Sequence, residues 1–322
     1  MTDAPLLPDP GARPVDAALA GAFLRERYGP SVCDVVPFDQ GEWSKAYGFR
    51  HDGQERVAKF SPLEEDFAKD RFAGRWRSPH LPIPRVLELG PAFGGYFVVA
   101  ERLHGGFIDD LDAGGMRALL PALLGTLDAM READLSGTSG YGLWGADGNA
   151  TFPSWSAFLL DVGVDHAAKR IAGWRATLEQ SAVGAGPFDE AYTLLSTLAP
   201  RCPNVRTLVH SDLLHFNVLV ADDRITGLLD WGCSLYGDFL YDVAWFTFWA
   251  PWEPAWNGID FGAEALRHYA RLGLDVPDVA LRLRACELQI GLDGMAYQAY
   301  KGFWSDLQWT AARTLELARR PL

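Results

Sequence analysis

Three polar side chains follow one another in the second half of the chain: Asp212, Asn217 and Asp230. The first two lie in the run His-Ser-Asp-Leu-Leu-His-Phe-Asn at 210–217, and the third ends the apolar run 225–229. Phosphoryl transfer needs one carboxylate that accepts the proton of the attacking hydroxyl. It also needs a carboxylate and an amide oxygen that hold magnesium on the phosphates. The three side chains supply these groups, although Asp and Asn are also frequent in ordinary turns.

A cation for the nucleotide phosphates is expected at Lys59, in a Val-Ala-Lys-Phe run near the end of a predicted strand. Its carboxylate partner should come from the helix that follows, and we favour Asp70 over Glu64 and Glu65. A solvated helix face is the alternative for all three. The segment 41–48 precedes the strand and would cover the phosphates, but it lacks the GxGxxG pattern, so a plain surface hairpin is the alternative.

Two further groups of side chains follow Asp230. Asp238, Tyr241 and Asp242 are predicted to be structural, with Asp238 capping a helix. The segment 244–256 carries four of the twelve tryptophans. Its aromatic rings fit a hydrophobic core and a ligand-binding wall equally well.

The elements that must position these residues divide the chain in two. Helices are expected at 15–28, 63–77, 112–134, 154–180, 187–200 and beyond 239, and strands at 44–50, 56–61, 85–90, 95–102, 207–209, 217–220 and 225–229. We therefore predict an α+β fold with two lobes. A small β-rich lobe at 1–103 would bind the nucleotide, and a larger, mainly helical lobe at 104–322 would carry catalysis and the acceptor. Residues 1–14 are Pro-rich and are expected to be disordered.

Composition narrows the class of partner. The 322 residues carry a net charge of −13, which disfavours nucleic acid and anionic membranes and attracts cations. No apolar run is long enough to span a bilayer, and none of the four cysteines forms a CxxC pair. The expected protein is a cytoplasmic monomer with reduced thiols that acts on a small cationic molecule.

Several runs resemble a known family. HSDLLHFN, DWGCSLYGDFLYD and VAKF are similar to the aminoglycoside phosphotransferases, and in particular to the type that acts on hygromycin B. Further similar segments extend from about residue 40 to residue 300. The resemblance implies a bilobal, protein-kinase-like fold. It also implies phosphorylation of a hydroxyl on an aminoglycoside or aminocyclitol antibiotic, which confers resistance, with ATP (GTP being the alternative) and Mg²⁺.

The resemblance also assigns roles to residues. It implies that Asp212 is the catalytic base and that Asn217 and Asp230 are the magnesium ligands. The nucleotide would be bound by Lys59 on its phosphates, by Ser44 in the loop above them, and by the backbone of Glu101, Arg102 and Leu103, which form the adenine hinge. The acceptor would be contacted by Trp249, Trp252, Glu287 and Asp293. The segment 213–216 is bulkier than the family pattern, and we expect it beside the acceptor hydroxyl.

Two other functions remain open at this stage. The acceptor could be another small hydroxyl compound, such as a macrolide, choline, homoserine or a sugar. The chain could also be a catalytically inactive, kinase-like binding protein, although such a protein would have no need of the set Lys59, Asp212, Asn217 and Asp230.

Overall fold

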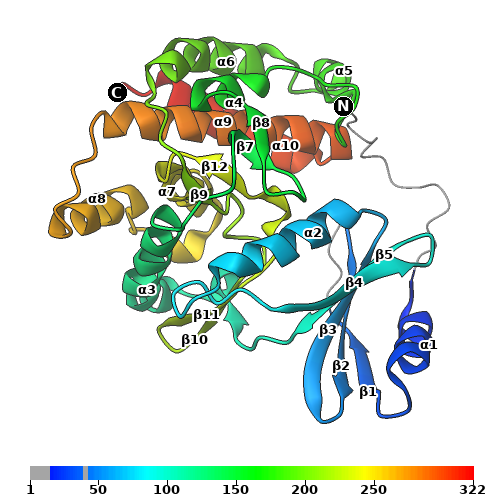
Figure 1. Ribbon diagram of the computed structural model, residues 1–322. Coiled ribbons are helices and arrows are strands. Elements are labelled where there is room, and N and C mark those ends of the chain that lie inside the picture. The colour runs from blue at the N-terminus through cyan, green and yellow to red at the C-terminus, as the bar shows by residue number, and fades with distance from the viewer. Residues whose placement is uncertain (1–14, 39–42) are drawn as a thin grey trace.

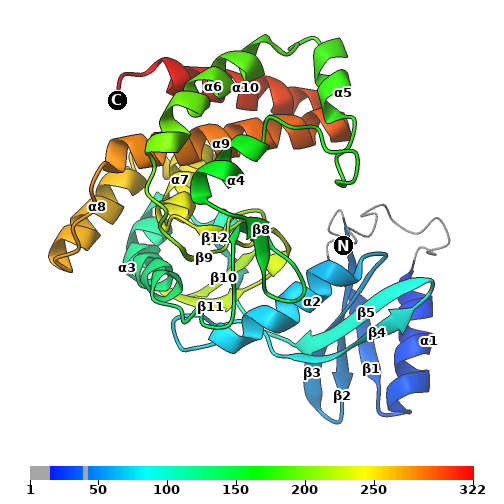
Figure 2. The same cartoon turned by 45° about the horizontal axis from the view of Figure 1, so that its top comes forward.

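The computed structural model describes residues 15–38 and 43–322. The predictions for residues 1–14 and for residues 41 and 42 lie outside these ranges. Figures 1 and 2 show a small β-rich lobe beside a larger, mainly helical one. The α+β class and the two-lobe arrangement predicted from the sequence are thereby confirmed.

The small lobe is built on one antiparallel sheet with strand order β1-β2-β3-β5-β4. Its elements are α1 (Ala17–Tyr28), β1 (Cys33–Pro37), β2 (Lys45–His51), β3 (Gln54–Ser61), β4 (Val86–Ala92) and β5 (Gly95–Glu101). An Asp-Gly turn joins β2 to β3, and Asp52 and Gly53 both have positive φ. Alternate residues of β2 and β3, including Tyr47, Phe49 and Phe60, are buried in the core that this sheet forms with α1.

Helix α2 (Glu64–Ala73) follows β3 and continues into the 3₁₀ turn η1 (Gly74–Trp76). It ends eight residues before the Leu-Pro-Ile-Pro run at 81–84, whose prolines cannot continue a helix. The side chains of Ala73, Trp76 and Ile83 belong to the core of the large lobe. The two cores therefore do not divide at residue 103, because part of the first hundred residues packs on the second lobe.

The large lobe contains most of the helices and two small sheets, with strand orders β11-β10-β6 and β8-β7-β12-β9. Its strands are β6 (Gly106–Phe107), β7 (Tyr141–Trp144), β8 (Ala150–Phe152), β9 (Thr207–Val209), β10 (Val218–Ala221), β11 (Arg224–Leu228) and β12 (Leu235–Gly237). Its helices are α3 (Ala113–Arg131), α4 (Trp155–Asp161), α5 (Trp174–Gln180), α6 (Gly186–Leu198), α7 (Leu240–Trp249), α8 (Phe261–Arg271), α9 (Val279–Lys301) and α10 (Trp304–Arg319), with the short 3₁₀ turns η2 (Ile108–Asp110), η3 (Ala199–Arg201), η4 (Trp231–Cys233), η5 (Ala250–Trp252) and η6 (Pro254–Trp256).

The single helix predicted over 154–180 was wrong. Two helices, α4 and α5, occupy its ends and a loop joins them. Gly173, with φ 87°, starts α5 in a left-handed conformation that a continuous helix cannot contain. The strands β1, β6, β7, β8 and β12 were missed, and all except β1 are four residues or shorter.

Helix α9 is the centre of the large lobe, where α7 and α10 pack against it (Figure 1). A buried ion pair joins its first turn to the start of α7, since the Arg282 guanidinium donates to both carboxylate oxygens of Asp238 at 2.8 Å. Asp238 also accepts the backbone N–H of Leu240, the first residue of α7, although the N-cap position of that helix is Phe239. No helix within the described residues is long and apolar enough to cross a membrane.

Candidate active site

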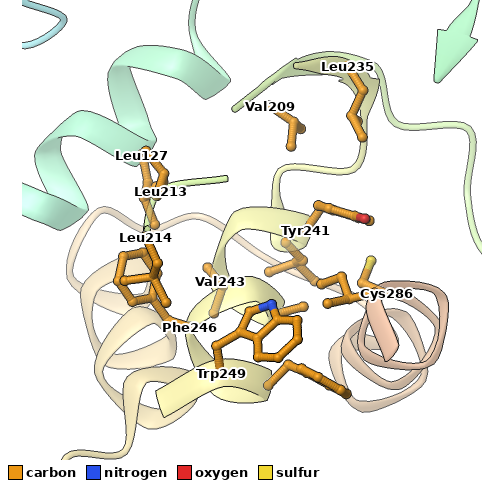
Figure 3. Packing of buried hydrophobic residues seen from close by; sticks show 14 of the residues in the cluster. Leu127, Val209, Leu213, Leu214, Leu235, Tyr241, Val243, Phe246, Trp249 and Cys286 are labelled. Carbon is orange, nitrogen blue, oxygen red and sulfur yellow. The ribbon is translucent and has the colours of Figure 1, made fainter. Parts of the chain in front are cut away.

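The loop that carries Asp212 divides its side chains between core and solvent. Leu213 and Leu214 are 0% and 3% exposed and point into the core between α3 and α7, near Leu127 and Phe246 (Figure 3). The prediction that all of 213–216 lines the acceptor site was therefore wrong for its first two residues. Their hydrophobicity anchors the loop, and only His215 and Phe216 reach the surface.

One end of this loop is held by Asp242 of α7. Its two carboxylate oxygens accept the backbone N–H groups of His210 and Ser211 at 2.9 and 2.8 Å. Ser211 has a positive φ of 60°, which costs a non-glycine residue about 1–2 kcal/mol. Burial raises the pKa of Asp242 to about 7 despite these two hydrogen bonds. The structural role expected for Asp242 is thus to fix the backbone directly before the base.

The other end is held by Asp109, in the turn η2 after β6. Its carboxylate oxygens accept the N–H groups of His215 and Phe216 at 2.8 and 3.0 Å. Both residues have positive φ, 60° and 68°. The sequence did not single out Asp109, because more than a hundred residues separate it from the loop and no spacing pattern connects them.

The carboxylate of Asp212 has two side-chain neighbours. The amide Nδ2 of Asn217 donates to its Oδ2 at 2.9 Å and to its backbone oxygen at 3.0 Å. The imidazole Nδ1 of His215 lies 2.9 Å from Oδ1. Desolvation alone would lower the pKa of His215, but the hydrogen bond and negative charge of Asp212 outweigh it and raise that pKa. The sequence placed His215 beside the acceptor hydroxyl, within the segment 213–216, but assigned no role to its imidazole.

Asn217 and Asp230 come together at the open end of the β10–β11 hairpin. The N–H of Leu229 donates to the backbone oxygen of Asn217 at 2.8 Å, which sets the two segments side by side. Because Asn217 uses its Nδ2 on Asp212, its amide oxygen remains for a metal. The carboxylate of Asp230 is exposed. This all-oxygen pair fits Mg²⁺, which binds through one or two side chains together with substrate phosphates.

Lys59 in β3 pairs with Asp70 in α2, with 3.7 Å between Nζ and Oδ2. Asp70, rather than Glu64 or Glu65, is thus its partner. Desolvation opposes a charged Lys59, but Asp70 and Asp230 outweigh it and raise the pKa of the ammonium group. Asp70 also accepts the N–H of Trp231 at 2.9 Å. The carboxylate therefore connects the strand lysine to the backbone next to Asp230.

The predicted hinge lies where β5 leaves the small sheet. The Glu101 side chain is paired with Arg77, and Arg102 lies 3.6 Å from Glu55. No described residue makes a hydrogen bond with the backbone of Leu103. Ser44 directly precedes β2 and is half-buried. The structure thus places Leu103 directly after β5 and Ser44 directly before β2, and their nucleotide-binding roles stay predictions.

The four predicted acceptor contacts are in different environments. Trp249 is buried and stacks on Trp309 of α10 with 5.8 Å between ring centroids, whereas Trp252 is 37% exposed. The carboxylate of Glu287 is buried against Thr247, to which it is hydrogen-bonded at 2.7 Å. That contact indicates a packing role for Glu287.

Asp293 lies on α9 and reaches solvent. The protein surrounding it nevertheless desolvates the carboxylate, which raises its pKa, and the charge of Lys169 opposes this rise. A desolvated carboxylate of this kind is suited to a cationic ligand.

Comparisons with known proteins show the family and the fold of this chain. Residues 34–287 match the family described as the phosphotransferase enzyme family, APH. The chain belongs to the APH family of phosphotransferases. It is 32% identical over 303 residues to hygromycin-B 4-O-kinase of Escherichia coli, and the match covers 92% of this chain and 84% of that protein.

Solved structures extend the similarity to the fold. The crystal structure of aminoglycoside phosphotransferase APH(4)-Ia superposes with a TM-score of 0.83 at 30% identity, covering 94% of this chain and 99% of the other. A thermostable mutant of that protein in a ternary complex with AMP-PNP and hygromycin B gives 0.81 at 30% identity, covering 93% and 97%. The chain is accordingly an O-phosphotransferase that uses a nucleotide and has the kinase-like fold.

Proposed function

We propose that this protein transfers the γ-phosphate of ATP to a hydroxyl of an aminocyclitol antibiotic of the hygromycin B type, and so confers resistance. The observation that carries phosphoryl transfer is the convergence of Asp212, Asn217 and Asp230 on the hairpin end and the loop beside it. The 32% identity to hygromycin-B 4-O-kinase, spread over 92% of the chain, supports the acceptor class.

In this proposal Asp212 orients the acceptor hydroxyl and takes its proton as the oxygen attacks phosphorus. The hydrogen bond from Asn217 keeps the carboxylate in one orientation, so that its remaining lone pairs face the acceptor. Lys59, held by Asp70, contacts the phosphates, and Ser44 lies in the loop above them. Catalysis then depends mostly on positioning and electrostatics.

Asn217 and Asp230 are the residues that would hold magnesium, which neutralises charge on the phosphate oxygens when bound. Their oxygens lie on adjacent backbone segments, as a shared ion requires. The backbone of Glu101, Arg102 and Leu103 would bind the purine, and this position leaves both ATP and GTP possible. The lobe at 1–103 would carry the nucleotide, and the lobe at 104–322 the base and the acceptor.

The acceptor would lie on the large lobe, near Asp293 and the exposed Trp252. A desolvated carboxylate attracts an amino group, and an aromatic face packs on the apolar side of a sugar ring. The net charge of −13 adds long-range attraction for a cation. We also propose that the protein is a cytoplasmic monomer. All four cysteines are free thiols, as is usual for proteins of a reducing compartment.

The decisive experiment is mass spectrometry of a mixed aminoglycoside panel after incubation with the protein and Mg·ATP, with the Asp212→Asn variant as control. We expect one hygromycin-type component to gain the mass of a phosphoryl group with the wild-type protein alone. A parallel panel contains a macrolide, choline, homoserine and a sugar. If one of these is phosphorylated and hygromycin B is not, the proposed acceptor is wrong and that compound represents the acceptor class. Absence of all products alongside normal Mg·ATP binding would favour the inactive binding protein.

A further inference from the structure

The imidazole of His215 stands beside the catalytic base without a role in the chemistry described above. Its Nδ1 is 2.9 Å from Oδ1 of Asp212, and Asn217 occupies the other carboxylate oxygen. Each oxygen of a carboxylate accepts up to two hydrogen bonds, so one site on each remains for the acceptor hydroxyl. The two donors together restrict the carboxylate to a single orientation.

The imidazole is itself fixed by its surroundings. Its backbone has a left-handed φ of 60°, and Asp109 holds it there through the His215 N–H. Such a conformation persists only where the surrounding structure imposes it. The ring also makes T-shaped contacts with Trp245 and Trp249, at centroid distances of 6.2 and 5.9 Å.

These contacts place the ring next to both the two tryptophans and the base. The His215 side chain is nevertheless 59% exposed, and its Nε2 has no hydrogen-bond partner within the described ranges. Phe216, the next residue, points elsewhere and packs edge-on against Phe107. The strained backbone therefore separates two neighbouring rings and turns one of them toward the base.

We propose that His215 is a positioning residue that holds the Asp212 carboxylate through its Nδ1–H for attack by the acceptor. The proposal rests on the proposed function, because it assigns the way in which the base of that reaction is oriented. The hydrogen bond to Asp212 is charge-assisted, and such bonds hold their partners more firmly than neutral ones. His215 itself neither forms nor breaks a bond to the substrate.

Three variants separate this role from general support of the loop. His215→Ala removes the donor, His215→Asn keeps an N–H at the place of Nδ1, and His215→Gln moves the N–H outward. With hygromycin B and Mg·ATP we expect kcat of His215→Ala to fall about tenfold to a hundredfold while KM for ATP is unchanged. His215→Asn should stay within about threefold of wild type, and His215→Gln should be as slow as His215→Ala.

A matched control is His268→Asn, because His268 of α8 also contacts an aspartate, Asp128 of α3, and α8 lies at the edge of the large lobe in Figure 1. Its kcat should equal that of wild type. An Asn variant as slow as the Ala variant, or an Ala variant within about twofold of wild type, would overturn the proposal.

A readout independent of turnover keeps the proposal testable if hygromycin B is not the acceptor. In ¹⁵N NMR spectra the Nδ1 resonance of His215, assigned by its absence in His215→Asn, should shift toward that of a free imidazole in Asp212→Ala. An unchanged resonance would refute the contact even if the phosphorylation assay succeeds. If the resonance shifts but no hygromycin product forms, the contact between His215 and Asp212 is supported and the proposed acceptor is wrong.

Discussion

Replacement of Asp109 by alanine should slow turnover although the residue lies outside the predicted catalytic set. Its carboxylate accepts the N–H groups of His215 and Phe216 at 2.8 and 3.0 Å and holds both in left-handed backbone. Without it the loop that carries Asp212 loses its support on one side, while Asp242 still holds the other.

The magnitude follows from these contacts. Hydrogen bonds to a charged group contribute about 1.5–3 kcal/mol each, and exposure to water at this site favours the lower value, about 3 kcal/mol for the pair. The left-handed backbone conformations of His215 and Phe216 cost about 1–2 kcal/mol each. Without the hydrogen bonds to Asp109, nothing offsets this strain. Since about 1.4 kcal/mol is a factor of ten, the productive loop conformer should fall in occupancy and reduce kcat about tenfold to a hundredfold.

Steady-state kinetics with Mg·ATP and hygromycin B measure the effect, and calorimetry should show an unchanged affinity for Mg·ATP. The matched control is Asp110→Ala, which removes the neighbouring exposed carboxylate and should leave kcat unaltered. Adding Phe216→Gly to Asp109→Ala should recover part of kcat, because glycine adopts positive φ without strain. Wild-type kcat in Asp109→Ala, or an equal loss in Asp110→Ala, would refute the reasoning.

Four further predictions follow from individual contacts. Asp212→Asn should lower kcat by about a hundredfold to ten-thousandfold while calorimetry shows Mg·ATP binding retained, because the variant loses a base but no phosphate contact. Asp230→Ala should abolish magnesium-dependent nucleotide binding in the same calorimetric assay. Arg282→Met should lower the unfolding free energy by about 3–5 kcal/mol in urea denaturation, because it leaves the buried Asp238 carboxylate unpaired. The wild-type protein should lose unfolding free energy relative to Asp242→Asn as the pH rises from about 4 to about 7. The folded state keeps the Asp242 proton up to about pH 7, whereas the unfolded chain releases it near the usual value of about 3.9.

The outcomes that contradict these four are distinct. Near-normal kcat in Asp212→Asn would show that Asp212 is not the catalytic base. Unchanged Mg·ATP affinity in Asp230→Ala would show that Asp230 is not a magnesium ligand. The double variant Arg282→Met with Asp238→Leu should regain unfolding free energy relative to Arg282→Met alone. If the single and the double variant lose equal unfolding free energy, the unpaired Asp238 charge is not the cause. Parallel pH profiles for wild type and Asp242→Asn would show that the buried carboxylate keeps its ordinary pKa.

The local sequence determined the chemical groups and much of the secondary structure. The strands around Lys59 and the turn at Asp52 and Gly53 follow from alternating apolar residues and turn chemistry, which are local properties. The spacing from Asp212 to Asn217 likewise predicts phosphoryl transfer, because both residues belong to one loop. Short strands such as β12 escaped prediction, since three residues carry too little periodicity to be recognised.

Tertiary structure alone decided how those groups are held. The sequence suggested the leucines after Asp212 as acceptor contacts, but the core between α3 and α7 buries them (Figure 3). His215 is left beside Asp212. Asp109 and Asp242 support the loop from 103 and 30 residues away in the chain, through contacts that no local pattern encodes. A sequence thus specifies which side chains can do chemistry, whereas packing between distant segments decides which of them meet and in what orientation.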